Sequence, residues 1–255
     1  MRKLFRIVIG LVVIVAVIGT LWMYHTNNLY EQSFTAEYRY QVDMDPGSGS
    51  GLNNVTLYVP LPSENGAGIS LEDINRPDDW EVSTVDTVHG EMLEISAERI
   101  ETANRSNSSP LRPGEEPQTP GPQDRTLRLN RITETIISNK EINTANPHGN
   151  EPVLNPKYDL TRTECSFPHG GDQPLKCYQY RSAMFINYGS ESNGSNVSDA
   201  GLNVSVTFEG SNSWWIYGWN GNEYRDRIYF TVEGDEGWFE SEGQLIAGQG
   251  SYRRT

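Results

Sequence analysis

The pattern of apolar and polar positions divides the chain into one long apolar run and a much longer region of alternating residues. The run from Ile7 to Tyr24 has no charged residue and follows a basic tip, residues 1–6. A helix of about 18 residues is ~27 Å long, close to the thickness of the hydrocarbon core of a bilayer. We therefore predict a transmembrane helix over 7–24 and a juxtamembrane linker over 25–32.

A cleaved secretory signal is the alternative interpretation, since such signals also begin with basic residues. Its best cleavage site, residues 17–19, lies inside the apolar run, and Trp22 and Tyr24 suit the aromatic belt of a retained span. The basic flank precedes the run, so the positive-inside rule places the N-terminus in the cytoplasm. We predict an uncleaved signal-anchor, single-pass in the cell membrane, with the bulk of the chain extracellular.

Beyond the anchor, apolar residues recur with a period of two, which is typical of half-buried strands. In residues 54–61, for example, every odd position is apolar. About ten such strands without alternating helices predict an all-β fold, an antiparallel β-sandwich of immunoglobulin-like or jelly-roll-like type. The expected strands are 34–42, 54–61, 80–88, 91–97, 126–137, 177–187, 202–208, a hairpin over 213–232, and 238–246.

One extracytoplasmic domain over residues 33–250 is the preferred organisation, because the first half has few large apolar residues of its own. Residues 101–125 contain five prolines and almost no apolar side chains. Such a stretch cannot bury enough surface to order itself, so we interpret it as a Pro-rich mobile insertion. Two small sandwiches that divide near this insertion remain the alternative.

The net charge of −14 argues against nucleic acid and anionic lipid as partners, because both need cationic patches. The 20 basic residues comprise sixteen arginines and only four lysines. An acidic, lysine-poor chain is typical of halophilic proteins, since at molar salt the Debye length is only ~3 Å and carboxylates repel one another weakly. An ordinary acidic secreted protein is the alternative.

Cys165 and Cys177 are the only cysteines. In an extracellular chain such a pair most simply forms a disulfide, which would contribute about 3 kcal/mol through loop closure. A metal site that combines both thiols with His169 and His148 is an alternative, although its spacing matches no familiar zinc pattern. Two free thiols are the third possibility.

Six N-x-[ST] sequons make the chain competent for glycosylation, about twice the number expected by chance. Two of them lie on the polar parity of predicted strands, and the other four lie in predicted loops, so all six are expected to be exposed. The six acceptor residues are Asn54, Asn104, Asn107, Asn193, Asn196 and Asn203.

No familiar catalytic or cofactor motif occurs in the chain. We therefore predict no catalytic residue, no resident metal and no cofactor. Two acidic clusters beside glycines, Asp43–Asp45 and Glu233–Glu236, are alternatives as Ca²⁺ sites, with a solvated turn as the preferred interpretation. A hydrolase of unknown type is the least favoured function.

The hairpin over residues 213–232 is the segment richest in aromatic residues, and Asn220-Gly221-Asn222 is its strongest turn signal. A turn there places two sets of residues on opposite faces. The expected core wall is Trp215, Tyr217, Trp219, Tyr224, Ile228, Phe230 and Val232. The expected outward face is Trp214, Ile216, Arg225, Arg227 and Tyr229.

The outward face is the most specific candidate interaction surface. Trp, Tyr and Arg dominate protein interfaces, and the rings of Trp214 and Tyr229 would also suit a platform for sugars. Cover by another part of the same chain is the structural alternative. We predict a membrane-anchored interaction or envelope module, an accessory subunit that binds another surface or membrane protein. A surface glycan-binding module is the alternative function.

Overall fold

The computed structural model describes residues 2–46, 51–64, 67–69, 73–101, 130–166, 171–190, 202–232 and 236–252. These residues form one helix and a set of strands that are all paired in antiparallel ladders. The elements are α1 (Arg2–Ser33), β1 (Thr35–Pro46), β2 (Leu52–Glu64), β3 (Ala67–Gly68), β4 (Trp80–Thr87), β5 (Gly90–Ile100), β6 (Arg131–Ile137), β7 (Val153–Asn155), β8 (Tyr158–Thr163), β9 (Lys176–Ser190), β10 (Leu202–Trp215), β11 (Trp219–Val232) and β12 (Glu236–Gly250).

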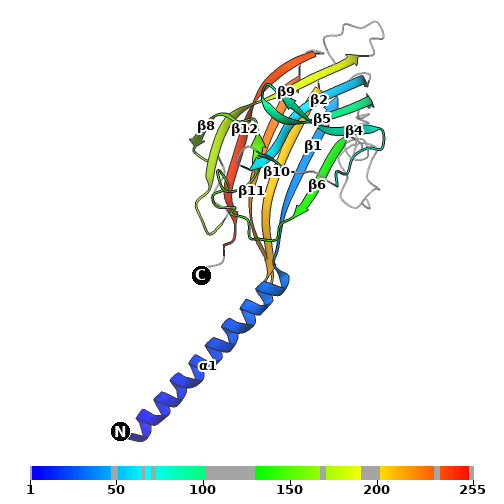
Figure 1. The fold of residues 1–255 in the computed structure, drawn as a ribbon. Helices are drawn as coiled ribbons and strands as arrows, with labels where there is room; N and C mark the ends of the chain where they lie inside the picture. The colour runs from blue at the N-terminus through cyan, green and yellow to red at the C-terminus, as the bar shows by residue number, and fades with distance from the viewer. Residues whose placement is uncertain are drawn as a thin grey trace, which may run out of the picture.

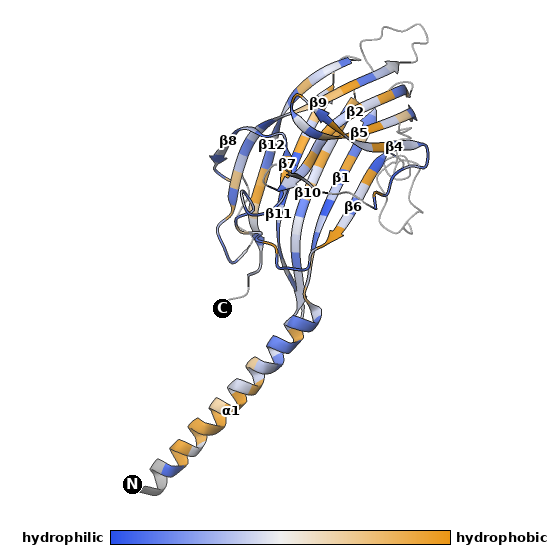
Figure 2. Ribbon diagram, in the orientation of Figure 1, coloured by the Kyte–Doolittle hydropathy of each residue, from blue (hydrophilic) through white to orange (hydrophobic). Residues whose placement is uncertain are grey.

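Helix α1 is a continuous rod that projects from one end of the sheet (Figure 1). Its part far from the sheet is hydrophobic and its last turns are hydrophilic (Figure 2), and by length and composition it could span a membrane. The predicted linker over 25–32 is helical and forms these last turns. Only Phe34 separates α1 from β1, so the helix passes almost directly into the sheet.

The predicted all-β antiparallel sandwich is confirmed, in the form of one continuous sheet that curls over a shared core (Figure 1). Its strand order is β4-β5-β2-β9-β12-β11-β10-β1-β6, with β3 and β7 paired to β2 and β8 paired to β9. The curl brings its two edges together. Asn75, just before β4, exchanges two backbone hydrogen bonds of 2.9 Å with Thr133 of β6.

The strands bury alternate residues, as the period of two predicts. In β10 the even positions from Leu202 to Trp214 face inward, and in β11 the even positions from Tyr224 to Val232 do the same. Two tyrosines pack over glycines on the neighbouring strand. Tyr224 lies over Gly210, and Tyr180 of β9 lies over Gly243 of β12.

The β10–β11 hairpin turns at residues 216–218, rather than at the predicted Asn220–Asn222. Trp215 therefore pairs with Trp219, and Trp214 pairs with Asn220. Because the predicted turn lay in the wrong place, the faces of the tryptophans were predicted wrongly. Trp214 is only 4% exposed, whereas Trp215, Tyr217 and Trp219 are 37%, 53% and 75% exposed. The assignment of the remaining residues from Tyr224 to Val232 is confirmed.

The segment of residues 138–157, which we call the inner segment, crosses the concave face of the sheet. It includes the short strand β7, which pairs with β2. Side chains from several strands hold its backbone: Asn212 bonds both the N–H and the C=O of Ile142, at 2.9 and 2.8 Å. The Pro-rich insertion predicted at 101–125 lies, apart from Glu101, outside the described residues.

Candidate functional site

The outer face of β11 and β12 carries a shallow hollow of about 420 Å³. Three of the five residues predicted as an interaction surface line it: Arg225, Arg227 and Tyr229. They are successive odd positions of β11, so they point away from the core together. Strand β12 completes the lining with Glu242, Gln244, Ile246 and Gln249. We call this hollow the outer groove.

Arg225 is neutralised within the chain. Its guanidinium group lies 2.9 Å from the carboxylate of Glu209 and 3.1 Å from that of Glu223. Burial, followed by the nearby charge of Glu209, raises the pKa of Glu223. Arg225 therefore acts as a clamp between two carboxylates that would otherwise repel each other.

Arg227 is different, because it makes no ion pair with any residue that the structure describes. Its guanidinium carbon lies 4.2 Å from the ring centroid of Tyr229, a cation–π contact. Tyr229 is 52% exposed. Within the described part of the chain, the buried amide oxygen of Gln249 also lacks a hydrogen-bond partner. The outer groove thus offers one cation, one ring and one acceptor to a ligand.

Trp214 and Ile216, the other two predicted surface residues, lie outside the outer groove. Trp214 packs inside the domain against Tyr30 of α1, with the ring centroids 5.7 Å apart. Ile216 is half-buried in the hairpin turn. The expected platform of Trp214 and Tyr229 is therefore not formed, since one of its rings is covered by the same chain.

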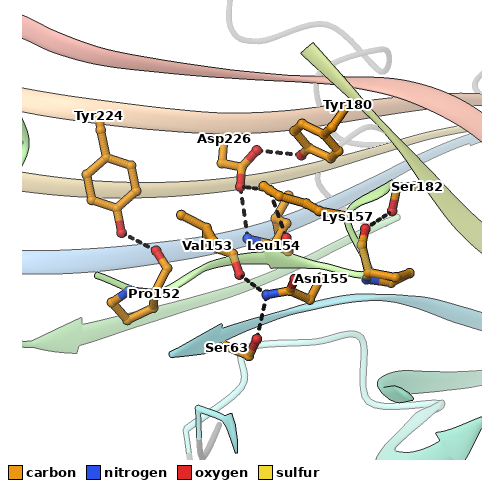
Figure 3. A network of polar contacts seen from close by, with 11 residues as sticks. Ser63, Pro152, Val153, Leu154, Asn155, Lys157, Tyr180, Ser182, Tyr224 and Asp226 are labelled. Atoms are coloured by element: carbon orange, nitrogen blue, oxygen red, sulfur yellow. Dashed lines mark hydrogen bonds and ion pairs between the residues drawn. The ribbon is translucent and has the colours of Figure 1, made fainter. Parts of the chain in front are cut away.

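A second cluster of polar residues lies in the core, where the inner segment meets the sheet (Figure 3). The carboxylate of Asp226 accepts hydrogen bonds from the Tyr180 hydroxyl at 2.5 Å, from the Leu154 N–H at 2.9 Å and from Lys157. Lys157 also donates to the Leu154 carbonyl at 2.8 Å and lies over the Tyr180 ring. Every group in this cluster therefore has a partner.

The Asp226 cluster is shielded from solvent, because the side chains of Asp226 and Lys157 are 0% and 7% exposed. Burial lowers the pKa of Lys157, although the charge of Asp226 opposes this shift. Burial, followed by the charge of Asp226, raises the pKa of Tyr180 well above its ordinary value. Because the groups are satisfied by one another and enclosed, we assign this cluster to the stability of the inner segment rather than to ligand binding.

The two cysteines form the predicted disulfide, with an S–S distance of 2.09 Å. It links the chain after β8 to β9, so neither sulfur is a free thiol, and His169 of the alternative metal site lies outside the described residues. Asp43 of one acidic cluster pairs with Arg131 at 2.5 Å. In the other, residues 233–235 are not described. No cluster of metal-ligating side chains occurs in the described ranges.

Two of the six sequons can be located. Asn54 and Asn203 are both exposed on strands, as expected from their parity. Asn104, Asn107, Asn193 and Asn196 lie outside the described residues. Glycosylation of any of them remains a prediction.

The sequence alone does not predict the β12 lining of the outer groove. Gln244 and Ile246 lie on the outward parity of a predicted strand, but nothing in the sequence indicates that β12 is the neighbour of β11 on this side. Comparisons with protein-family models, curated proteins and solved structures find no match to the chain.

Proposed function

We propose that the protein is a membrane-anchored binding module that engages another surface or membrane protein through the outer groove. The observation that carries this proposal is Arg227, a guanidinium group beside an exposed ring with no carboxylate partner among the described residues. In a chain of net charge −14, an unneutralised arginine in a hollow is complementary to an acidic side chain of a partner.

The chemistry of the outer groove favours a protein over a glycan. The glycan platform expected from the sequence needs the rings of both Trp214 and Tyr229, and Trp214 is buried. Tyr and Arg are also the residues that most often dominate the free energy of protein interfaces. The amide oxygen of Gln249, which has no hydrogen-bond partner among the described residues, would suit a donor group on the same partner.

The position of the module follows from its anchor. We propose that α1 spans the cell membrane with its basic tip in the cytoplasm, because the positive-inside rule favours that orientation. The disulfide between Cys165 and Cys177 supports an oxidising compartment for the sheet. The outer groove would then face the extracellular side, where another envelope component can reach it.

Co-purification of the full-length chain from its native membranes, at the salt concentration of the source, tests this proposal. We expect a stoichiometric partner, identified by mass spectrometry. Replacement of Arg227 by Glu together with Tyr229 by Ala should lower its recovery about tenfold or more, since hot-spot truncations cost 2 kcal/mol or above. Trp214 is left unchanged because it is buried.

Arg162→Glu is the matched control, because it makes the same charge change at an exposed position of β8, away from the outer groove. The control should retain the partner. If the variant of Arg227 and Tyr229 recovered as much partner as the unaltered chain, the proposal would be contradicted. A chain that purifies alone, but whose fluorescence responds to a saccharide in a broad panel, would instead favour the glycan-binding alternative.

A further inference from the structure

The turn of the β10–β11 hairpin exposes a group of aromatic side chains that the core does not use. Trp215, Tyr217 and Trp219 all stand on the outside of the turn, and Trp219 is the most exposed of the three. No residue from Ser213 to Asn222 carries a charge, although the chain as a whole is strongly acidic. We call the residues from Trp215 to Trp219 the hairpin tip.

The hairpin tip lies against helix α1 at the place where its apolar part ends. Tyr217 stacks on Trp22, with ring centroids 5.3 Å apart, and its ring centroid lies 6.2 Å from that of His25. Trp215 joins the same group, 6.1 Å from Tyr217. Because the apolar run of α1 ends at Tyr24, these contacts place the hairpin tip level with that end.

Two further contacts hold the hairpin beside the last turns of α1. The Ser33 hydroxyl accepts a hydrogen bond of 2.8 Å from the Trp215 N–H, and the Tyr30 ring contacts Trp214. The turns of α1 from His25 to Ser33 thus run beside the hairpin. Trp and Tyr are enriched at membrane–water interfaces, where an apolar ring and a polar N–H or O–H are satisfied at once.

We propose that the hairpin tip is a second membrane contact, with Trp215, Tyr217 and Trp219 in the lipid headgroup region beside Trp22. The occupant of this surface is the bilayer itself, recognised by uncharged aromatic rings rather than by charge. The contact would fix the tilt of the sheet relative to the membrane and hold the outer groove at a constant height. It rests on the proposed role of α1 as a membrane span, and it is independent of the outer groove.

Quenching by brominated lipid tests this contact in the full-length chain reconstituted in lipid nanodiscs. Trp22→Phe serves as the background, because Trp22 would otherwise be quenched as part of the span. We expect lipids brominated near the headgroup to quench this variant. Further replacement of Trp215 and Trp219 by Phe should remove most of the quenched component, whereas Trp238→Phe, on the outer face and away from α1, should leave it.

The possible outcomes separate the two proposals. Absence of quenching, with the tryptophans of the tip open to acrylamide, would overturn the membrane contact while leaving the anchor intact. If neither brominated lipid nor acrylamide quenched these tryptophans, the membrane contact would also be overturned, because a protein surface such as a second copy of the chain would then cover the hairpin tip. Release of the chain from membranes by alkaline carbonate would overturn the anchor itself. Circular dichroism of each variant verifies that the sheet is unchanged.

Discussion

Lys157 of the inner segment and Asp226 of β11 form an ion pair in the interior of the curled sheet, where neither side chain has appreciable contact with solvent. A buried pair of this kind gains little over a well-packed apolar pair, but it is costly to break on one side only. The pair connects the inner segment, just after its short strand β7, to the middle of the sheet. Its role is therefore to hold the inner segment in one position.

Replacement of Asp226 by Asn is expected to destabilise the protein by roughly 3–5 kcal/mol, because it leaves the Lys157 charge buried without a counter-charge. Chemical denaturation followed by circular dichroism measures this loss. The double variant with Lys157→Met should recover much of the stability, since no buried charge remains. A double variant no more stable than Asp226→Asn would contradict this account.

Replacement of Gly243 by Ala should also destabilise the fold. A Cβ atom there would lie 2.3 Å from the Tyr180 ring, so the ring and its hydrogen bond to Asp226 must move. Overpacking of this kind costs about 1–3 kcal/mol, measurable as a lower midpoint of thermal unfolding. Gly218→Ala is the matched control, since nothing lies within 4 Å of its Cβ. Equal midpoints for the two variants would refute the close packing.

The Arg225 clamp predicts a pH-dependent loss of stability. The pKa of Glu223 is raised in the folded state, so protonated Glu223 favours the folded protein. This stabilisation is fully present below the pKa of 4.5 that Glu223 has in the unfolded chain, and it is lost as the pH rises through the pKa of the folded state. Arg225→Gln removes the cation that opposes this shift. We expect the variant to lose up to about 1 kcal/mol near neutral pH and less in acid, where Glu223 is protonated.

Thermal unfolding at acidic and neutral pH measures this difference. Arg162→Gln removes the same charge from an exposed site and should shift the midpoint similarly at both pH values. A loss for Arg225→Gln that is the same in acid and at neutrality would mean that the clamp is not needed to offset repulsion between Glu209 and Glu223.

The buried tyrosines predict cooperative alkaline unfolding. Burial raises the pKa of Tyr40, Tyr180 and Tyr224, and each hydroxyl donates a hydrogen bond inside the domain. Because the pKa values of these tyrosines are higher in the folded state, the neutral phenols stabilise the fold below the ordinary phenol pKa of 10.0. This stabilisation is lost as the pH rises above that value. Phenolate absorbance and circular dichroism should therefore change together for these residues. Complete ionisation in a chain that still shows its folded spectrum would contradict the prediction.

Local patterns of apolar and polar residues were sufficient to predict most of the strands. The hairpin of β4 and β5 turns next to His89 as predicted, and the alternation in β2 and β10 identifies the residues that face the core. Alternation depends only on burial of one face of a strand, so it can be read without knowing the neighbour. The same holds for the apolar run of α1 and for the disulfide, which needs only two cysteines in an oxidising compartment.

The turn between β10 and β11 could not be located in this way. Asn220-Gly221-Asn222 is a strong local turn signal, but the side chain of Asn222 is buried and accepts hydrogen bonds from Thr144 and Asn212 at 2.5 and 2.8 Å. Thr144 is distant in the sequence and Asn212 is the residue paired with Asn222 on β10, so both hydrogen bonds hold Asn222 within the strand. The resulting register moved Trp214 into the core, since a slip of one residue exchanges the two faces.

By itself, the sequence determined the apolar helix, the all-β fold and the outward parity of Arg225, Arg227 and Tyr229, because each depends on a periodicity within one segment. Only the tertiary structure decided what those segments meet. It placed β12 beside β11 to complete the outer groove, the inner segment over Asp226, and Tyr217 against Trp22. Pairing of distant strands is set by the summed packing and hydrogen bonding of the whole core, and no local window of residues contains that information.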